Sequence, residues 1–504
     1  MTRRADCIAV GPFWVAEQGF SMNASMPPND RGYHPGDFLD TLLVTDLTVE
    51  GRGLARHEGM VVFLDRGLPG ALVSAHVTVV KKRVIEARVH EVLRRSPHAV
   101  ALWCPHAKEC GACLWQHFSP DSALDWKRGH VRETLARIAK ITDIEVMPVQ
   151  PSPKVREYRN KMAFAFSRSP EGASLLGLRK RKEHNIVEVT QCGIQPAPAM
   201  DILACIRKAV TRLGLEAFSR NTEGRHQGYL RFLVIHTPEY RPGGEQQVLV
   251  ECITGTNHEH ETARVKAEGE KRLTNAEAVR LIGEELMESF ALTGFVHSER
   301  KQNSEVAQGE RLVRQIGNAG YEERFGHLTL TVPHNVFLQT NTGAAALLYE
   351  RVAHEAGLDG SQTVWDLYSG VGSIALYLAP KARQVHGLEI QADAVIAAQS
   401  NSEALGFSHC RFYQGVLTHE MVRHTPPPDL IVLDPPRAGI DERAREMLLH
   451  LAKARRMLYI SCDVATQARD LAFLAPAWKA VKSFPVDMFP NTPHVENLVV
   501  LEHQ

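Results

Sequence analysis

The stretch Leu430-Ile-Val-Leu-Asp-Pro-Pro-Arg437, together with Leu458-Tyr-Ile-Ser-Cys-Asp463, decides the fold of the last third of the chain. Each begins as a short apolar run bounded by turn or helix signals, which is the pattern of a buried parallel strand. Each run then changes abruptly to polar residues, so we expect Asp434 and Cys462 at the carboxyl ends of their strands. Open α/β sheets bind ligands at that edge. A cysteine after a strand is commonly a small buried apolar residue, but beside a strand-end acid we interpret Cys462 as a nucleophile.

A strand, a glycine loop and a helix precede these two strands. They are predicted over Thr363–Ala379, and the next predicted strand, Gln384–Glu389, ends in an acid. Glycines allow a tight turn and the close approach of a ligand, and Glu389 is placed to accept hydrogen bonds from ribose hydroxyls. The pattern predicts an α/β, Rossmann-like nucleotide-binding domain.

The same loop supports a competing interpretation. Gly370-Val-Gly-Ser-Ile-Ala375 fits the G-x-G-x-x-A dinucleotide fingerprint, as in a nicotinamide-dependent oxidoreductase. A pyrophosphate prefers a helix N-terminus without an adjacent acid, and Asp366 lies just ahead of the loop. The cationic, phosphate-free cofactor S-adenosylmethionine (SAM) tolerates an acid there. We therefore favour SAM.

Length and composition bound the class of protein. A chain of 504 residues exceeds one core and indicates about three domains. It is 44% hydrophobic without an apolar run near 18 residues, which predicts a globular protein with no membrane contact. The start lacks a secretory pattern, because Asp6, Gly11 and Pro12 interrupt it. We expect a cytoplasmic protein whose cysteines are free thiols, metal ligands or catalytic groups.

The net charge is zero, but the charge is unevenly distributed. Residues 51–200 contain 24 Lys and Arg against 14 Asp and Glu. Such asymmetry is compatible with one basic face that follows a phosphate backbone. Chance clustering on a solvated surface is the alternative interpretation.

The N-terminal part divides into an extension and a barrel. Residues 1–37 show no period and contain many turn residues, so we expect a disordered extension. Residues 38–95 contain five short β-type runs at the spacing of a small closed barrel of the OB type. Lys81-Lys82-Arg83 lies at one predicted hairpin, which indicates either an oligonucleotide-binding edge or a solvated turn of a structural barrel.

Four cysteines in the next region have the spacing of a ligand set. Cys104, Cys110 and Cys113 lie within ten positions, and Cys192 follows a predicted strand much later. Gly111 lets the backbone wrap closely around a bound ion or cluster. All-thiolate sites suit both zinc and iron–sulfur clusters, so the residues alone leave the two open.

The rest of the middle region predicts an α+β domain to about residue 325. Helices are expected within 120–140, over Met200–Leu213 and over Asn275–Leu286, with strands between them. A further helix to about Glu355 is preceded by an amide pair, Gln339 and Asn341. These amides either cap the helix or present hydrogen bonds to a base edge.

Together these motifs resemble the RNA uracil-5-methyltransferases of the TrmA/RumA family, most closely the RlmD (RumA) branch, which acts on 23S rRNA. The resemblance covers residues 38–504. It rests on five motifs: Phe337-Leu-Gln-Thr-Asn341, Asp366-Leu-Tyr-Ser-Gly370, Asp434-Pro-Pro-Arg437, Ser461-Cys-Asp463 and His494-Val-Glu-Asn497.

The resemblance implies three domains. They are a TRAM barrel over 38–95, a central α+β domain over 96–325 and a Rossmann-like SAM-dependent methyltransferase domain over 326–504. The central domain is implied to carry a 4Fe-4S cluster on four cysteines: Cys104, Cys110, Cys113 and Cys192. The tRNA-specific branch generally lacks both barrel and cluster, so their presence points to rRNA.

The family also implies roles for individual residues. The residues implied to bind SAM are Gln339, Tyr368, Ser373, Glu389 and Asp434. Ser373 stands where relatives often have Asn.

The chemistry that the family implies explains the catalytic set. The Cys462 thiolate adds to carbon 6 of uracil, which makes carbon 5 nucleophilic toward the methyl group. Asp434 and Arg437 orient the base, and Glu496 removes the carbon-5 proton. An acid at a strand end on the surface is the alternative interpretation of Glu496. The target base has to be flipped out of its stack or taken from a loop.

Three classes of function thus compete. They are an RNA uracil-5-methyltransferase, an iron–sulfur or nicotinamide oxidoreductase, and a non-catalytic RNA-binding protein that uses the barrel. Only the first needs a nucleophile at the strand end of Cys462. We predict the first, with 23S rRNA as partner, a tRNA uracil-5-methyltransferase as the alternative, and no obligate protein partner.

Overall fold

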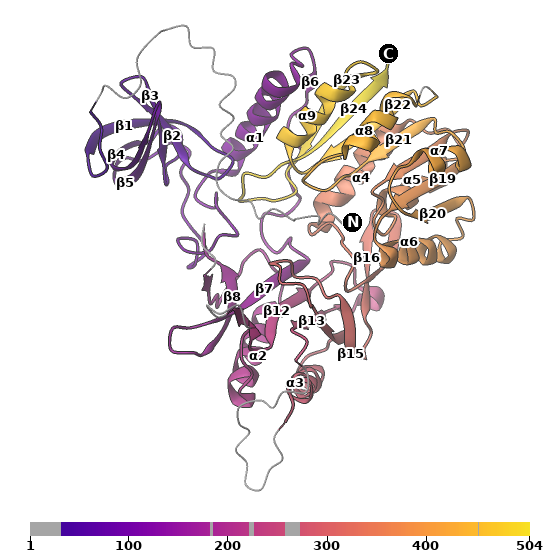
Figure 1. Ribbon diagram of the computed structural model, residues 1–504, viewed down its shortest axis with the longest axis horizontal. Helices are drawn as coiled ribbons and strands as arrows, with labels where there is room; N and C mark the ends of the chain where they lie inside the picture. The colour runs from indigo at the N-terminus through magenta and orange to yellow at the C-terminus, as the bar shows by residue number, and fades with distance from the viewer. Residues whose placement is uncertain (1–31, 182–184, 221–225, 258–272, 452) are drawn as a thin grey trace, which may run out of the picture. The chain divides into compact units, whose positions relative to one another are not determined.

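The computed structural model describes residues 32–181, 185–220, 226–257, 273–451 and 453–504 (Figure 1). The chain forms two compact units, one with residues 1–46 and 52–94 and the other with residues 47–51 and 95–504. Of the extension predicted over residues 1–37, residues 1–31 lie outside the described residues. Among the described residues, no helix combines the length and apolar character needed to cross a membrane.

The first unit is a closed five-stranded barrel, as predicted. Its strands are β1 (Phe38–Leu47), β2 (Gly53–His57), β3 (Met60–Leu64), β4 (Leu72–Lys81) and β5 (Val84–Arg94), in the order β1-β2-β3-β5-β4. Buried and partly buried residues alternate along β3, because successive side chains point to opposite faces. Lys82 and Arg83 form the turn between β4 and β5 and are exposed.

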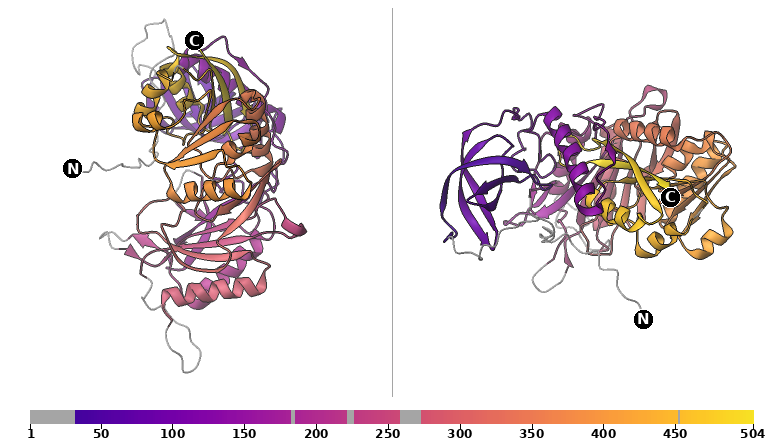
Figure 2. Two further views of the ribbon diagram at one scale, coloured as in Figure 1. Left: turned by 90° about the vertical axis from the view of Figure 1, so that its right-hand side faces the viewer. Right: turned by 90° about the horizontal axis from the view of Figure 1, so that it is seen from above.

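The second unit contains a seven-stranded sheet in the order β15-β14-β13-β12-β7-β8-β9. Its strands are β7 (Lys161–Arg168), β8 (Ser174–Arg179), β9 (Ile186–Val187), β12 (Leu230–His236), β13 (Leu249–Thr254), β14 (Gly294–Glu299) and β15 (Arg311–Gly317). Helices α2 (Ala199–Leu213) and α3 (Asn275–Ser289) share one apolar core with this sheet (Figure 2). Every residue of β12 and β13 is buried, because both faces of the sheet are covered.

The eight-stranded sheet of the same unit has the order β20-β19-β18-β21-β22-β24-β23-β6. Its strands are β6 (Glu145–Val146), β18 (Thr363–Leu367), β19 (Gln384–Glu389), β20 (Cys410–Gln414), β21 (Leu430–Leu433), β22 (Arg456–Ser461), β23 (Trp478–Val486) and β24 (Glu496–His503). Strands β18 to β22 are mutually parallel, whereas β24 pairs antiparallel with β22. The predicted mixed α/β class is confirmed.

Helices cover both faces of this sheet. On one face lie α4 (Thr342–Ala356), α5 (Ser373–Leu378), α6 (Ala392–Ala404) and the hairpin β16–β17 (Gly320–Phe325, Leu328–Pro333). On the other lie α8 (Glu442–Leu449), α9 (Val464–Leu474), α1 (Pro120–Thr134) and a π-helix (Leu135–Ala139). Helix α1 therefore packs on the C-terminal sheet, although it precedes the seven-stranded sheet in sequence. The expected helix within 120–140 is present.

The remaining elements are short. They are the pair β10 (Ser219–Arg220) and β11 (His226–Gln227), the helix α7 (His419–His424) and 3-10 turns at Pro242–Gly244 and Ala379–Lys381. The first of these turns connects the antiparallel strands β12 and β13.

Candidate active site

The strand order of the eight-stranded sheet brings the predicted site residues to one edge. Asp434 follows β21 and Cys462 follows β22, which are adjacent parallel strands. Strand β24 runs the other way, and its residue Asn497 pairs with Ser461, so Glu496 at the start of β24 reaches the same edge as Cys462. On the other side of β21, the glycine loop follows β18, and Glu389 ends β19. Asp434, Cys462 and Glu389 thus lie at strand ends on one edge, as the sequence predicted, and the structure adds Glu496 to that edge.

The glycine loop holds the Glu389 carboxylate by its backbone. Gly370 N–H donates to Glu389 Oε2 over 3.0 Å, and Gln391 N–H donates to Oε1 over 2.8 Å. Gly372 has φ +79°, and a Cβ there would lie 2.9 Å from the Phe412 ring, so glycine is required. At Gly370 no atom lies within 4 Å of the position of a Cβ. The loop thus leaves open space beside a fixed carboxylate.

Asp366 contacts the start of the helix that follows this loop. The carboxylate accepts a hydrogen bond of 2.9 Å from Ala375 N–H at the start of α5. Burial, with Asp434 and Glu389 nearby, raises the pKa of Asp366 to about 8. The carboxyl group is therefore mostly neutral at pH 7. In the free protein, Asp366 at neutral pH therefore repels a pyrophosphate less than a charged aspartate would. The argument from sequence that Asp366 alone excludes a pyrophosphate is weakened accordingly.

Two buried polar atoms at the loop fit a polar ligand. Asp366 Oδ1 and Ser369 Oγ are buried and have no hydrogen-bond partner among the described residues. Buried polar atoms are normally paired. Together with the open space at Gly370 and the fixed Glu389, they fit a nucleoside cofactor such as SAM.

The amide pair Gln339 and Asn341 divides into a site residue and a helix cap. Asn341 is the N-cap of α4, and its side chain accepts from Ala344 N–H over 3.1 Å. The Gln339 side chain instead hydrogen-bonds to Asp434, which stabilises the Asp434 carboxylate. Asn160 fixes this segment, because its Nδ2 donates to the Gln339 carbonyl over 3.1 Å.

Ser373 and Tyr368 face different neighbours. Ser373 Oγ hydrogen-bonds to the Tyr349 hydroxyl over 3.1 Å. Tyr368 has φ +67°, and its side chain hydrogen-bonds to Asp441 at the N-cap of α8. Tyr349 is fully buried, and Asp434 acts on its pKa, which burial raises. No sequence pattern distinguishes Tyr349 from a core residue, because it belongs to the apolar stripe of α4.

Cys462 lies among charged groups. Burial, followed by Glu496 and Asp434, raises the pKa of the Cys462 thiol to about 11, and Arg437 lowers it through its charge and a hydrogen bond. The thiol is therefore protonated at neutral pH in the free protein. A cation beside it, or protonation of a carboxylate, shifts it toward the nucleophilic thiolate.

The two carboxyl groups of the site are coupled. Burial raises the pKa of Asp434 to about 7. Burial and the nearby Asp434 raise the pKa of Glu496 well above its ordinary value, while Arg437 opposes the shift. Two adjacent carboxyl groups cannot both ionise easily out of water, so the pair retains a proton near neutral pH. Such a pair can accept or return a proton in this range.

The four predicted ligand cysteines converge in the second unit. Cys192 and Cys104 both act on the pKa of Cys110 and on that of Cys113, each of which burial raises. Gly111 N–H donates to the Arg179 carbonyl over 3.0 Å, so the cysteine loop lies against the end of β8. A strand precedes Cys192 as predicted, but this strand, β9, ends at Val187, and a bend lies between it and Cys192.

Close packing brings the distant cysteine to the others. A Cβ at Gly193 would lie 2.3 Å from the ring of Trp103, so the residue after Cys192 sits directly on the residue before Cys104. Among the described residues, no group of three or more His, Cys, Asp or Glu is arranged to hold a single metal ion.

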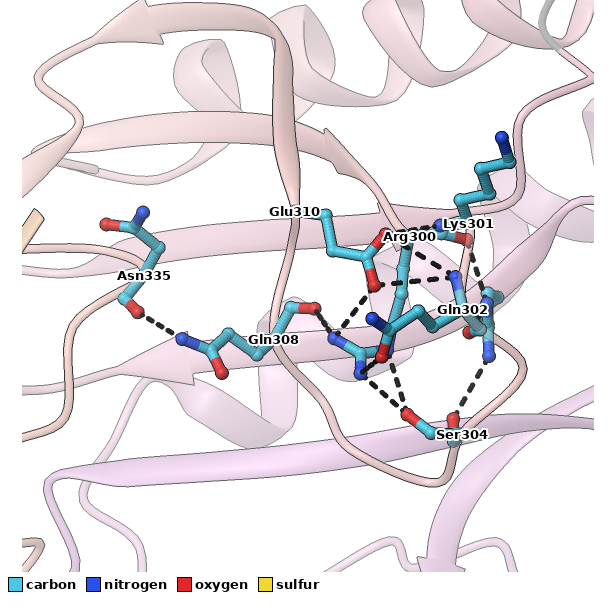
Figure 3. A network of polar contacts seen from close by, with 8 residues as sticks. Arg300, Lys301, Gln302, Ser304, Gln308, Glu310 and Asn335 are labelled. Atoms are coloured by element: carbon cyan, nitrogen blue, oxygen red, sulfur yellow. Dashed lines mark hydrogen bonds and ion pairs between the residues drawn. The ribbon is translucent and has the colours of Figure 1, made fainter. Parts of the chain in front are cut away.

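A network of polar contacts holds the loop between β14 and β15 (Figure 3). Arg300 Nη1 donates to the Gln308 carbonyl over 2.8 Å, and Arg300 Nε donates to Ser304 Oγ over 3.0 Å. The Gln308 side chain then donates to the Asn335 carbonyl over 2.9 Å (Figure 3). Gln391, next to the Glu389 loop, donates to the same carbonyl over 3.2 Å. The loop at 300–310 therefore supports the chain segment that leads to Gln339.

Two sequence families match parts of the chain. The family described as tRNA (Uracil-5-)-methyltransferase matches residues 427–504, which include Asp434, Cys462 and Glu496. The TRAM domain family matches residues 41–90, which lie in the barrel.

Relatives extend this likeness over nearly the whole chain. A protein of Nitratidesulfovibrio vulgaris described as an RNA methyltransferase is 39% identical over 473 residues, which cover 92% of this chain and 96% of the relative. An RNA methyltransferase of Halalkalibacterium halodurans is 30% identical over 91% of this chain and 96% of its own length. The solved Pyrococcus abyssi tRNA (uracil-54, C5)-methyltransferase with S-adenosyl-L-homocysteine has a TM-score of 0.68, 23% identity, and coverage of 92% of this chain and 100% of its own. It shows the same fold.

The electrostatics of Cys462 make a first prediction. Above its raised pKa, ionised Glu496 raises the thiol pKa, and Glu496→Gln removes that charge, whereas Arg437→Gln removes a cation that lowers the thiol pKa. At a fixed pH above the raised pKa of Glu496 and below about 11, we expect Cys462 to react faster with iodoacetamide in Glu496→Gln and slower in Arg437→Gln, by about tenfold per unit of pKa. Mass spectrometry of the Cys462 peptide measures the rates. Equal rates in both variants and the parent would contradict these charge effects.

Proposed function

The chain belongs to the family of SAM-dependent RNA uracil-5-methyltransferases, and on this premise we propose that it forms 5-methyluridine in 23S rRNA through a covalent bond between Cys462 and uracil. The observation that carries the proposal is the row Asp434, Cys462 and Glu496 along one sheet edge, beside the glycine loop. A nucleophile next to a coupled carboxyl pair is what methylation of a weakly nucleophilic carbon needs.

The residues of the site divide the reaction into two steps. Cys462 Sγ adds to carbon 6 of uracil, with Arg437 stabilising the thiolate, and the electrons of the former double bond make carbon 5 nucleophilic. SAM supplies an electrophilic methyl group, which carbon 5 takes up. Glu496 then accepts the carbon-5 proton, and the bond between Sγ and carbon 6 breaks, which restores the ring double bond and releases Cys462.

Five side chains are proposed to bind SAM. They are Gln339, Tyr368, Ser373, Glu389 and Asp434. The hydrogen bonds of Glu389 to Gly370 and of Gln339 to Asp434 support this assignment, because they fix acceptors around the open space at the loop. A carboxylate at Glu389 suits ribose hydroxyls, and one at Asp434 suits a sulfonium cation.

The barrel supports an RNA substrate. Phe38, His76 and His90 are exposed on its outer face, with ring centroids 5.1 to 5.7 Å apart. Exposed rings beside basic side chains favour single-stranded RNA, because bases stack on aromatic faces. We propose 23S rRNA, since the family resemblance couples the barrel and the cysteine site to that substrate, and we expect the protein in the cytoplasm with its RNA. A tRNA uridine is the second candidate, because the solved tRNA (uracil-54, C5)-methyltransferase shares the fold.

We further propose that the four cysteines hold a 4Fe-4S cluster. The four thiols act on one another's pKa and so lie near one another, and all-thiolate sets of this kind hold iron–sulfur clusters. The cluster would join the Cys104–Cys113 loop to Cys192, and so tie distant segments together.

Glu496→Gln gives the sharpest test of the chemistry. The variant retains Cys462 and the size of the side chain but loses the base. We expect SAM binding and transfer of one methyl group, followed by a stall, because loss of a general base typically slows proton removal about 10²–10⁴-fold. A SAM-dependent protein–RNA band should therefore accumulate on a denaturing gel with total cellular RNA.

A control variant tests whether the band depends on Cys462, and sequencing identifies the trapped RNA. The double variant Cys462→Ala/Glu496→Gln is the matched control and should form no band. Sequencing of the trapped RNA should return a 23S rRNA fragment, whereas trapped tRNA would establish the second candidate. Turnover of Glu496→Gln at the parent rate would remove Glu496 from the mechanism.

The cluster proposal predicts iron and acid-labile sulfide in equal amounts in protein purified without oxygen. It also predicts the broad visible absorption of a brown protein. Elemental analysis and sulfide determination measure both. Stoichiometric zinc without sulfide would establish a mononuclear site instead.

The barrel turn gives a test of RNA binding. Lys81 pairs with Glu86 over 3.0 Å, so the charge-reversed residues are Lys82 and Arg83, which are exposed at the turn. Lys82→Glu/Arg83→Glu should weaken RNA binding and flatten its salt dependence, by a slope of about 0.7 for each lost phosphate contact to a single strand. SAM affinity should not change. Lys208→Glu on the exposed side of α2 is the control, and an equal loss there would assign the effect to net charge.

A further inference from the structure

The segment 487–495 leads directly into the proposed base. It connects β23 to β24, and Val486 pairs with Glu496 where the two strands meet. The segment also contains His494, whose pKa burial lowers to about 4, with Arg437 acting in the same direction. His494 therefore lies near the Cys462 partner Arg437. The conformation of this segment determines how the chain approaches the catalytic edge.

A buried lysine holds the start of the segment. Lys127, in α1, is 1% exposed, and its Nζ lies 2.5 Å from Asp487 Oδ1. The same Nζ donates to the Phe489 carbonyl over 3.3 Å. A buried ammonium without its partner is strongly unfavourable, so the pair fixes α1 and the segment against each other.

The middle of the segment is held by residues next to the cysteines. Trp115 N–H, two positions after Cys113, donates to the Asn491 carbonyl over 2.8 Å. The Asn491 side chain donates to the Val155 carbonyl over 3.0 Å. The hydroxyl of Tyr158, a residue only 1% exposed, donates to the Pro490 carbonyl over 3.2 Å.

Tyr158 lies between the cysteines and the segment. Burial raises the pKa of Tyr158, and the charges that raise it further come from Cys113, Asp487 and Cys192. The Tyr158 side chain therefore lies near both the thiols and the start of the segment. The contacts made by Lys127 and Tyr158 go to residues 487–490, whereas the glycine loop is fixed by Glu389.

We infer, on the basis of the proposed function, that Lys127 and Tyr158 are positioning residues for proton removal. They hold the 487–495 segment in the conformation that aims Glu496 at the carbon-5 proton, and they do so from the part of the chain that carries the four cysteines. The side chains proposed to bind SAM, and Cys462 itself, lie outside this segment. Displacement of a catalytic group by about 1 Å can cost about 10²-fold in rate.

The experiment uses full-length Tyr158→Phe and Lys127→Met with the RNA that Glu496→Gln traps. Tyr158→Phe removes one hydroxyl from a retained ring, and Lys127→Met removes the charge from a chain of similar length. Both should bind SAM with the parent affinity and form the methylated covalent complex. Both should release it roughly 10–10²-fold more slowly than the parent, so that the band accumulates. Calorimetry measures SAM affinity, and the decay of the band measures release.

Lys161→Met is the matched control, because Lys161 is a second desolvated lysine and the charged groups that act on its pKa, Glu251 and Arg159, are not in the segment. It should show no accumulation. If Lys127→Met fails to fold, Tyr158→Phe decides the result alone. Loss of SAM binding, uniform slowing without a band, or equal accumulation in Lys161→Met would overturn the inference. Absence of a band in Glu496→Gln itself would instead overturn the proposed function.

Discussion

Burial of three carboxyl groups at one edge of the eight-stranded sheet is the constraint on which the site depends. Asp366, Asp434 and Glu496 each have a raised pKa because they lie out of water and close to one another. A pyrophosphate would add negative charge to such an edge, whereas a sulfonium cation relieves the repulsion. The preference for a cationic cofactor therefore arises from the set of three, and not from a charged Asp366 alone. Arg437 acts on the pKa of both Glu496 and Cys462.

The topology of the sheet separates the two halves of the reaction. The glycine loop and Glu389, which are proposed to bind the cofactor, lie at the ends of β18 and β19. Cys462 and Glu496 lie at the ends of β22 and β24, and Asp434, after β21, lies between the two sets. The antiparallel direction of β24 is essential to this arrangement. A parallel β24 would begin at the opposite edge and take Glu496 away from Cys462 by the whole length of the sheet. A sequence-distant acid thus becomes the neighbour of the nucleophile by strand direction alone.

Much of this could be predicted from the sequence, because local patterns carry it. Strand ends after apolar runs located Asp434 and Cys462, alternation located the barrel strands, and the glycine loop located Glu389. Three features could not be predicted, since they depend on contacts between distant segments. The amide of Asn341 caps a helix while that of Gln339 reaches Asp434, although both are equally polar in sequence. Tyr349 resembles any core residue of α4. Helix α1 gives no sign in sequence of the sheet on which it packs.

The packing of α1 shows how residues from the middle of the chain contact the C-terminal sheet. Lys127 of α1 would be a buried charge without Asp487, and Asp487 would face the same cost without Lys127, so neither segment is stable in its place alone. Asn160, immediately before β7, donates a side-chain hydrogen bond to the Gln339 carbonyl. The eight-stranded sheet carries the proposed reacting groups, whereas residues from 115–160 contact the segments next to two of them. Lys127, Tyr158 and Asn160 all lie between Cys113 and Cys192 in sequence, so the part of the chain that contains the four cysteines also contacts the segments next to Glu496 and Gln339.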